Sequence, residues 1–252
     1  MKKTKINNFD LRPGEEVNTL VDDNLYIIQG QNQFRFGIDS VLLANWAKVK
    51  RKDTVIDLGT GNGAIPLILA YKRQPKKIIG LEIQKPLVEL ARRSVLLNEM
   101  SDKIDILKYD LRQAKEEFHA NYYPVVISNP PYFALGGGGI NPEDSKAIAR
   151  HEVCTTLTDL IKAAAYLLKT KGKFYFIHRV DRLPEICSKL SREGIEAKLM
   201  RLIQPHRASG PNLVLIKGVK GANPGLKMEP NLVVYDQNGE YTEEVLKMYY
   251  EE

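Results

Sequence analysis

The sequence predicts a doubly wound α/β fold built on a mostly parallel sheet. From residue 53 onward, short runs rich in β-branched residues alternate with longer segments of helical periodicity. The central short runs are almost entirely apolar, which is typical of parallel strands that helices cover on both faces. Toward the end of this array, two strand-like runs have no helix-length pattern between them. They predict an antiparallel hairpin at one edge of the sheet.

Each predicted strand is short, rich in β-branched or aromatic residues and bounded by turn residues. The strands are 53–59, 76–83, 103–110, 123–129, 172–179, 195–204 and 212–219, and the last two form the hairpin. The predicted helices are 64–73, 85–100, 156–171 and 181–193. Thr156 or Thr158 can cap the third helix, and Gly172 and Gly194 stand just past the ends of the last two. In the second helix one face is defined by Leu87, Leu90, Ala91, Ser94, Val95 and Asn98.

Two flanking segments complete the expected organisation. Residues 1–50 are predicted to form an N-terminal hairpin, within 25–37, and an amphipathic helix that begins near Asp39 or Ser40. Residues 51–220 form the main domain, and residues 221–252 form a C-terminal extension. The run Gly136–Gly139 opens a segment of about 20 residues without clear periodicity, and such loops are usually functional or disordered.

Composition limits the class of protein. The formal net charge is +6, which suits a polyanionic partner and equally suits a solvated basic surface. No uncharged apolar run is long enough to cross a membrane, and no secretory signal follows the basic start, so we expect a cytoplasmic protein. The 2 cysteines and 4 histidines lack metal-ligand spacing, so we expect no metal site and no disulfide scaffold.

The segment VIDLGTGNGAIPLILA places three glycines between a predicted strand and a predicted helix. Gly59, Gly61 and Gly63 permit a sharp turn and let a ligand approach the backbone, and the helix start offers free N–H groups. This pattern predicts a nucleotide-like ligand. Gly59, Gly61 and Ala64 also satisfy the dinucleotide fingerprint, so the glycines alone leave the ligand open.

Carboxylates at the ends of successive predicted strands indicate which nucleotide-like ligand the glycine turn binds. Asp57 would repel a diphosphate but attract an amino group, and Glu82 stands where a carboxylate accepts the hydroxyls of a ribose. Asp110 ends the third strand and can meet an adenine amino group. A ligand with an ammonium group, a ribose and an adenine is S-adenosylmethionine. Each carboxylate also has a structural interpretation: Asp57 as a turn cap, Glu82 paired with Lys85, and Asp110 as a helix N-cap.

The fourth strand brings the segment Asn129-Pro130-Pro131-Tyr132 to the same edge. An exocyclic amine or an amide nitrogen is a poor nucleophile because its lone pair is delocalised. The Asn129 side-chain oxygen and the Pro130 carbonyl can each accept one N–H, which holds and polarises such a nitrogen. Prolines add no competing N–H, and Tyr132 or Phe133 offers a face for stacking a planar group. The structural alternative is a rigid turn after a strand.

Taken together, DLGTGNG, GLEI, YD and SNPPYF resemble the class I S-adenosylmethionine-dependent amino-methyltransferases, whose sheet is Rossmann-like. With NQFRFGIDSVLLANWA upstream, residues 20 to 220 are most similar to the bacterial tRNA adenine-37 N6-methyltransferases. The resemblance implies that Phe36, Gly37 and Asp39 help close the methionine end of the cofactor pocket. It implies cofactor contacts at Gly37, Asp39, Asp57, Gly59, Gly61, Gly63, Glu82, Asp110 and Asn129. Arg150 is a weaker candidate for target binding, with a solvated side chain as the alternative.

Several other functions compete with RNA adenine methylation. The same N-P-P-Y segment serves glutamine N5-methyltransferases that act on proteins, because an amide nitrogen poses the same lone-pair problem. The basic charge and the lack of a separate N-terminal helical domain favour RNA, specifically tRNA. Adenine in DNA is a third substrate class, although this chain has little room for a target-recognition region. A non-catalytic S-adenosylmethionine-binding module would not need the N-P-P-Y segment.

Overall fold

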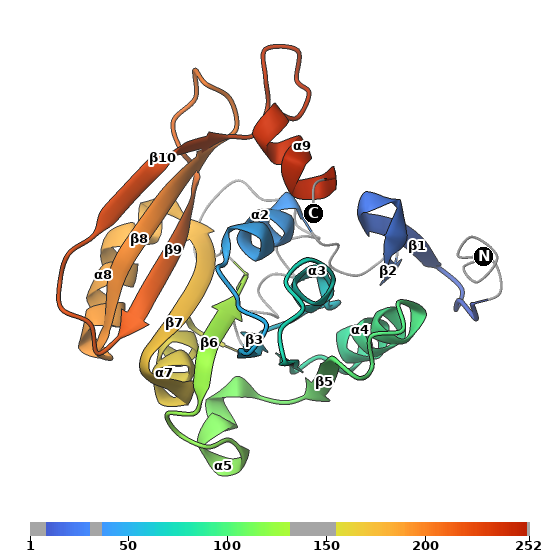
Figure 1. The fold of residues 1–252 in the computed structure, drawn as a ribbon, viewed down its shortest axis with the longest axis horizontal. Helices are drawn as coiled ribbons and strands as arrows, with labels where there is room; N and C mark the ends of the chain where they lie inside the picture. Colours follow the sequence, from blue (N-terminus) through green and yellow to red (C-terminus); the bar gives the residue numbers. More distant parts are fainter. Residues whose placement is uncertain (1–8, 31–36, 132–154, 251–252) are drawn as a thin grey trace.

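The computed structural model describes residues 9–30, 37–131 and 155–250 (Figure 1). The strands are β1 (Glu15–Val21), β2 (Leu25–Gly30), β3 (Thr54–Leu58), β4 (Lys77–Glu82), β5 (Ile104–Lys108), β6 (Tyr123–Ser128), β7 (Leu168–Arg179), β8 (Ile195–Gln204), β9 (Leu213–Lys220) and β10 (Lys227–Val233). The helices are α2 (Ile38–Trp46), α3 (Ala64–Lys72), α4 (Lys85–Leu97), α5 (Ala114–Glu117), α7 (Leu157–Leu167), α8 (Leu183–Arg192) and α9 (Glu243–Tyr250). Short 3₁₀ turns are η1 (Asp22–Asn24), η2 (Leu111–Gln113) and η3 (Val180–Arg182).

The central sheet confirms the predicted doubly wound topology. Its strand order is β10-β8-β9-β7-β6-β3-β4-β5. Strands β3 to β7 pair in parallel, whereas β9 is antiparallel to both β7 and β8. The chain runs outward from β3 through β4 to β5, then returns to add β6 and β7 on the other side of β3. The carboxyl ends of β3 and β6 are therefore adjacent at the topological switch point, where open α/β sheets bind ligands.

Helices cover both faces of the sheet, and one hydrophobic cluster fills each interface. On one face, α2, α3 and α4 pack with the inward side chains of β3, β4 and β5, and α9 packs against α2 (Figure 1). On the other face, α7 and α8 bury Phe174 and Phe176 of β7, whose rings stack at 4.5 Å. Within the described parts of the chain, every helix is too short or too polar to cross a lipid bilayer.

The predicted face of α4 is buried, and two of its polar members hold the N-terminal hairpin. Ser94 Oγ accepts a hydrogen bond from the Ile28 N–H at 2.9 Å. Asn98 Oδ1 accepts from the Tyr26 N–H at 3.0 Å, and its Nδ2 donates to the Tyr26 carbonyl at 2.6 Å. These side chains satisfy the free backbone groups at the edge of β2, so the small sheet docks onto the main domain through α4.

The N-terminal hairpin pairs different residues from those expected. Strand β2, inside the predicted 25–37 segment, pairs with β1, which was not predicted as a strand. Residues 31–36 lie outside the described part of the chain. The following helix begins at Ile38 with Gly37 as its N-cap, one position before Asp39, which lies in the first turn.

The third predicted helix ends earlier than its pattern suggests. Helix α7 stops at Leu167, and β7 starts immediately because Leu168 pairs with Tyr123 of β6. The carbonyls of Tyr166 and Leu167 accept hydrogen bonds from the N–H groups of Asn121 and Tyr122, which replace the helical bonds. Gly172 does not end the helix. It lies where an added Cβ would come within 2.7 Å of a backbone carbonyl.

The predicted antiparallel pair forms, but it does not end the sheet. Strand β10 pairs in parallel with β8 and becomes the outermost strand. It belongs to the 221–252 segment, and Glu229 within it accepts a 2.6 Å hydrogen bond from the indole N–H of Trp46 in α2. This segment therefore contributes directly to the main sheet. The strand contains Pro230, which lacks a backbone N–H for the sheet and weighs against a strand assignment from sequence.

Candidate active site

The glycine turn after β3 has the backbone conformation that its sequence predicts. Gly59, Gly61 and Gly63 all have positive φ, at 72°, 59° and 87°, which residues with a side chain rarely adopt. The N–H groups of Gly59 and Thr60 both donate to the Leu81 carbonyl of β4 at 2.9 Å, which fixes the turn to the neighbouring strand. Helix α3 begins directly after Gly63, so its free N–H groups open toward the switch point.

Glu82, the last residue of β4, is buried beside this turn. Its Oε2 accepts from the Gly61 N–H at 3.0 Å, and its Oε1 accepts from the Gln84 N–H at 2.9 Å. No ion pair joins it to Lys85 in the described structure, so that alternative is not realised. The Gln84 side-chain Nε2 also lies 3.5 Å from Oε1. A carboxylate has about four acceptor positions, so acceptor capacity remains for a hydroxyl donor.

Asp57 is fully buried in β3, and neither carboxylate oxygen has a hydrogen-bond partner among the described residues. Burial raises its pKa to about 7; the nearby Thr60 hydroxyl acts to lower that pKa, and the charge of Glu82 raises it further. A buried carboxylate without a partner is costly, and a cationic ligand would remove that cost.

Asp110 adopts the structural role that the sequence left open. It is the N-cap of η2, and its Oδ1 accepts from the Arg112 backbone N–H at 3.0 Å. The Arg112 guanidinium also binds both carboxylate oxygens, with Nε 2.9 Å from each. This interaction lowers the pKa of Asp110. Arg112 therefore already donates to both carboxylate oxygens that would have to accept a hydrogen bond from an adenine amino group.

Asn129 follows β6 directly and is held by α2. Its Nδ2 donates to Ser40 Oγ at 3.0 Å, and Ser40 is buried. The preceding Ser128 donates through Oγ to the Leu58 carbonyl at 2.7 Å, which ties the end of β6 to the end of β3. Asn129 and Pro130 are half-buried, whereas Pro131 is exposed. The amide of Asn129 thus has a defined orientation next to the glycine turn.

Gly37 and Asp39 belong to the same neighbourhood because Ser40 follows them at the start of α2. The Gly37 carbonyl accepts from the Ser40 N–H at 3.2 Å. Gly37 is exposed and Asp39 is half-buried. Phe36, Tyr132, Phe133, Arg150 and the Gly136–Gly139 run lie outside the described residues.

Sequence reasoning missed three polar residues at this edge. Ser40 holds Asn129, and Thr60 and Asn62 lie inside the glycine turn, buried. Thr60 Oγ1 and Asn62 Nδ2 have no hydrogen-bond partner among the described residues. A signal did exist for the last two, since a polar side chain between glycines of a binding turn is placed against the ligand.

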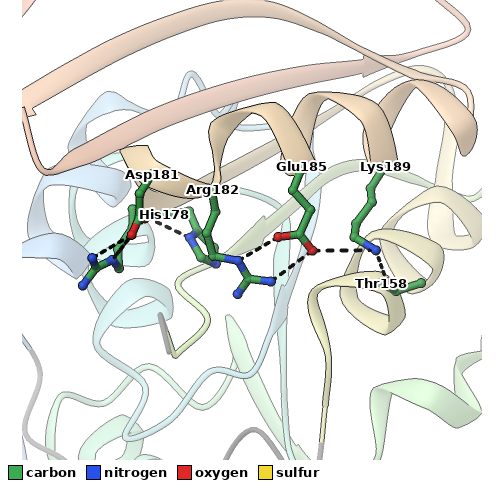
Figure 2. A network of polar contacts seen from close by, with 7 residues as sticks. Thr158, His178, Asp181, Arg182, Glu185 and Lys189 are labelled. Atoms are coloured by element: carbon green, nitrogen blue, oxygen red, sulfur yellow. Dashed lines mark hydrogen bonds and ion pairs between the residues drawn. The ribbon is translucent and has the colours of Figure 1, made fainter. Parts of the chain in front are cut away.

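A second polar network lies at the end of β7 and is shown in Figure 2. Arg182 Nε is 2.9 Å from Glu185, and Lys189 of α8 donates to Thr158 of α7 at 2.6 Å. Buried His178 lies beside Arg182 in Figure 2. Burial, assisted by the charge of Arg182, lowers the pKa of His178 to about 4. The imidazole is therefore neutral near pH 7. The network joins α7 to α8 at the carboxyl end of β7, the parallel neighbour of β6.

The buried polar atoms provide a test of whether the site fits S-adenosylmethionine. In the described structure, five buried side-chain polar atoms have no hydrogen-bond partner, and four of them belong to Asp57, Thr60 and Asn62. Unpaired buried polar groups are rare and call for a ligand or solvent. An unpartnered anion, free backbone donors and a carboxylate with spare acceptor positions match the ammonium, carboxylate and ribose of this cofactor.

Comparisons with known proteins agree with this chemistry. The family model described as methyltransferase small domain matches residues 33–183. The tRNA1(Val) (adenine(37)-N6)-methyltransferase of Tolumonas auensis is 27% identical over 224 residues, which cover 88% of this chain and 91% of the relative. The enzyme of the same name from Bacteroides thetaiotaomicron is 33% identical over 150 residues, or 58% of this chain and 60% of the relative.

Solved structures support the fold alone. A predicted O-methyltransferase from Agrobacterium tumefaciens superposes with a TM-score of 0.68 at 21% identity, covering 84% of this chain and 95% of that protein. A tRNA m1G37 methyltransferase from M. jannaschii superposes with a TM-score of 0.58 at 16% identity, covering 82% of this chain and 55% of that protein.

Proposed function

Because this chain belongs to the methyltransferase small-domain family and uses S-adenosylmethionine as its methyl donor, we propose that it methylates the exocyclic N6 amine of an adenine in tRNA. The observation that supports this most directly is the held amide of Asn129 beside the glycine turn. The relatives named as tRNA adenine N6-methyltransferases support the choice of substrate. We also infer that the protein acts in the cytoplasm, on the ground of its resemblance to these enzymes.

The proposed catalytic residues are Asn129, Pro130 and Tyr132. S-adenosylmethionine supplies an electrophilic methyl group. Asn129 Oδ1 and the Pro130 carbonyl would each accept one N–H of the target amine, which makes its lone pair available for attack. Ser40 Oγ accepts from Nδ2, and in this orientation Oδ1 is directed away from Ser40. Tyr132, with Phe133, would stack on the base, and Arg150 would contact the target RNA.

We propose that the cofactor is held by the predicted set at the ends of β3, β4 and β6 and at the start of α2. Asp57 would pair with its amino group, and Glu82 would accept its ribose hydroxyls. Asp110 would contact the adenine only if its carboxylate accepts hydrogen bonds from Arg112 and from the adenine at the same time. The complete set is Gly37, Asp39, Asp57, Gly59, Gly61, Gly63, Glu82, Asp110 and Asn129. We retain residues 51–220 as the methyltransferase domain, with 1–50 packed over the cofactor and 221–252 as its C-terminal extension.

The direct test is to incubate the purified protein with labelled S-adenosylmethionine and total bacterial tRNA, then to identify the labelled nucleoside by digestion and mass spectrometry. We expect N6-methyladenosine. Label that appears only in a protein substrate would overturn the proposal and favour a glutamine methyltransferase. Label in neither substrate, with cofactor still bound, would favour a non-catalytic module.

A variant at Asn129 separates catalysis from binding. Asn129→Ala should lower the single-turnover rate at saturating cofactor and tRNA by about 10²- to 10³-fold, the usual cost of removing a preorganised polar group that acts in the transition state. The affinity for tRNA should change much less. Asn129→Asp keeps an acceptor oxygen and should retain partial activity. A near wild-type rate for Asn129→Ala would reject this role even if the protein methylates tRNA.

A further inference from the structure

Lysines lie side by side across the outer strands of the sheet, away from the catalytic edge. The strand register aligns Tyr175 of β7, Lys217 of β9, Leu199 of β8 and Lys227 of β10 in one row. Directly paired residues project to the same face of a sheet, so Lys217 and Lys227 share the face of Tyr175. Tyr175 packs edge-on against Trp46 of α2 at 5.8 Å between ring centroids, which identifies this as the α2 face.

Two further lysines adjoin this row. Lys173 lies two positions before Tyr175 in β7 and therefore projects to the same face. Lys198 lies in the register shift of β8, and its ammonium donates to the Asn223 carbonyl at 3.0 Å. Burial lowers the pKa of Lys217, and the charges of Lys173, Lys198 and Lys227 lower it further, whereas Glu229 raises it. Lys217 is therefore close enough to each of the other three lysines to be repelled by their charges.

The segment after α2 adds more positive charge beside the row. Residues Lys48, Lys50, Arg51 and Lys52 are all exposed. The Tyr175 hydroxyl lies close to the Lys48 backbone. Burial raises the pKa of Tyr175 to about 12, and the contact with Lys48 acts in the opposite direction. We call these eight cations the basic surface: Lys48, Lys50, Arg51, Lys52, Lys173, Lys198, Lys217 and Lys227.

The basic surface has almost no internal neutralisation. None of its members forms an ion pair with a carboxylate among the described residues. Two acidic groups beside it already accept hydrogen bonds: Asp53 from the Lys50 N–H at 2.9 Å and Glu229 from the Trp46 indole at 2.6 Å. Clustered like charges that stay unpaired are costly, and a polyanion would relieve this repulsion.

Helix α2 connects this surface to the catalytic edge. Ser40, near its start, holds Asn129, and Trp46, at its end, contacts Tyr175. A helix of this length extends for about 14 Å, so the surface begins roughly that far from the target position. Its row crosses three strand spacings, or about 14 Å. Figure 1 shows α8 behind these strands and α9 near the end of β10 that lies farthest from Lys227. The dimensions suit an extended polyanion better than a single phosphate.

We propose that the basic surface binds backbone phosphates of the tRNA body while the target adenine occupies the catalytic edge at the other end of α2. The proposal rests on the proposed function for its choice of polyanion. The surface supplies affinity and orientation and makes no contact with the reacting atoms. Lysine ammonium groups act here as point charges, so the contacts carry no base specificity.

The test compares two triple variants of the full chain. One removes charge from the surface (Lys173→Gln, Lys217→Gln, Lys227→Gln), and the matched control removes three exposed charges elsewhere (Lys103→Gln, Lys162→Gln, Lys169→Gln). Binding of fluorescently labelled tRNA is measured by anisotropy over a range of salt concentrations. Each lost phosphate contact should reduce the slope of log affinity against log salt by about 0.7 to 0.9. We expect a reduction of about 2 to 3 for the surface variant and much less for the control.

Methyl transfer provides the second readout. The surface variant should raise KM for tRNA at least about tenfold and leave kcat and cofactor affinity unchanged, because its residues lie away from the reacting atoms. Equal slopes and equal KM for the two variants would overturn the proposal. The wild-type protein could bind tRNA with a salt dependence that the surface variant loses, yet transfer no methyl group to the tRNA. That result would support the proposed tRNA-binding surface and reject the proposed function. If wild type does not bind tRNA, both fail.

Discussion

At the scale of single residues, Asp57 and Glu82 show how two carboxylates at neighbouring strand ends acquire different properties. Both are buried, but Glu82 accepts two backbone N–H bonds, whereas Asp57 has no hydrogen-bond partner among the described residues. A hydrogen-bonded carboxylate tolerates its charge in the interior, and an unpaired one favours protonation. The consequence is a site in which one group titrates near neutral pH.

This difference predicts a pH dependence of stability without cofactor. The folded pKa of Asp57 is about 7, above its ordinary value of 3.8. The folded state therefore holds the proton more tightly, and the contribution of Asp57 to stability falls as pH rises from about 4 to about 7. The total loss is at most about 4 kcal/mol. Urea unfolding of wild type and Asp57→Asn across this range measures it. The stability difference between them should shift toward the variant at higher pH, and a constant difference would contradict the assignment.

Ser40 is predicted to be a positioning residue for Asn129. Ser40→Ala removes the acceptor of the Asn129 Nδ2 bond, and a typical hydrogen bond contributes about 0.5 to 1.5 kcal/mol. We expect the single-turnover rate of methyl transfer to fall roughly 2- to 10-fold with little change in cofactor or tRNA affinity. In an Asn129→Ala background the same change should have almost no further effect. Independent, multiplicative losses in the double variant would instead show that Ser40 acts through another group.

At the scale of elements, α7 shows a start fixed by local sequence and an end fixed by a neighbouring strand. Thr156 forms a capping box: its Oγ1 accepts from the Asp159 N–H at 3.2 Å, and Asp159 Oδ2 accepts from the Thr156 N–H at 3.0 Å. Thr156 and Asp159 are only three residues apart, so the sequence suffices to predict this capping box. The end at Leu167 depends on β6 and on residues 121 and 122, which no helical pattern contains.

The capping box gives a prediction for stability. Thr156→Ala should lower the free energy of unfolding by about 0.5 to 2 kcal/mol, because the N–H of Asp159 loses its acceptor. Chemical unfolding measures this loss, and Thr170→Ala, at an exposed position of β7, is the matched control. Equal stabilities of the two variants would mean that the capping box contributes nothing measurable.

At the scale of the whole molecule, the net charge of +6 predicts how binding responds to salt. If tRNA is the partner, its affinity for wild type should fall linearly on a log–log plot as salt rises, with a slope near the number of phosphates neutralised. Anisotropy titrations between about 50 and 200 mM salt cover the useful range. Because a charge-balanced protein substrate releases few counterions, a flat dependence would favour the glutamine methyltransferase alternative.

The sequence alone determined the features that depend on residues close together in the chain. The alternation of apolar runs with helical patterns specified the doubly wound sheet, because burial on two faces leaves a direct mark on each strand. The glycines of the turn after β3 predicted its positive φ angles, because residues other than glycine rarely adopt such angles. The placement of Asp57, Glu82 and Asn129 at one edge followed from the topology of parallel strands.

Only the tertiary structure decided which partners those residues meet. Arg112 binds the Asp110 carboxylate and Ser40 accepts from Asn129, whereas Asp57 has no hydrogen-bond partner within the described part of the chain. The sequence presents all three site residues alike. The lysines of the basic surface are separated by up to 179 positions between Lys48 and Lys227. Strand register and the packing of α2 on β7 bring them together. Hydrogen bonds and charge clusters act over a few ångströms in space, and a linear pattern carries no information about such distances between remote segments.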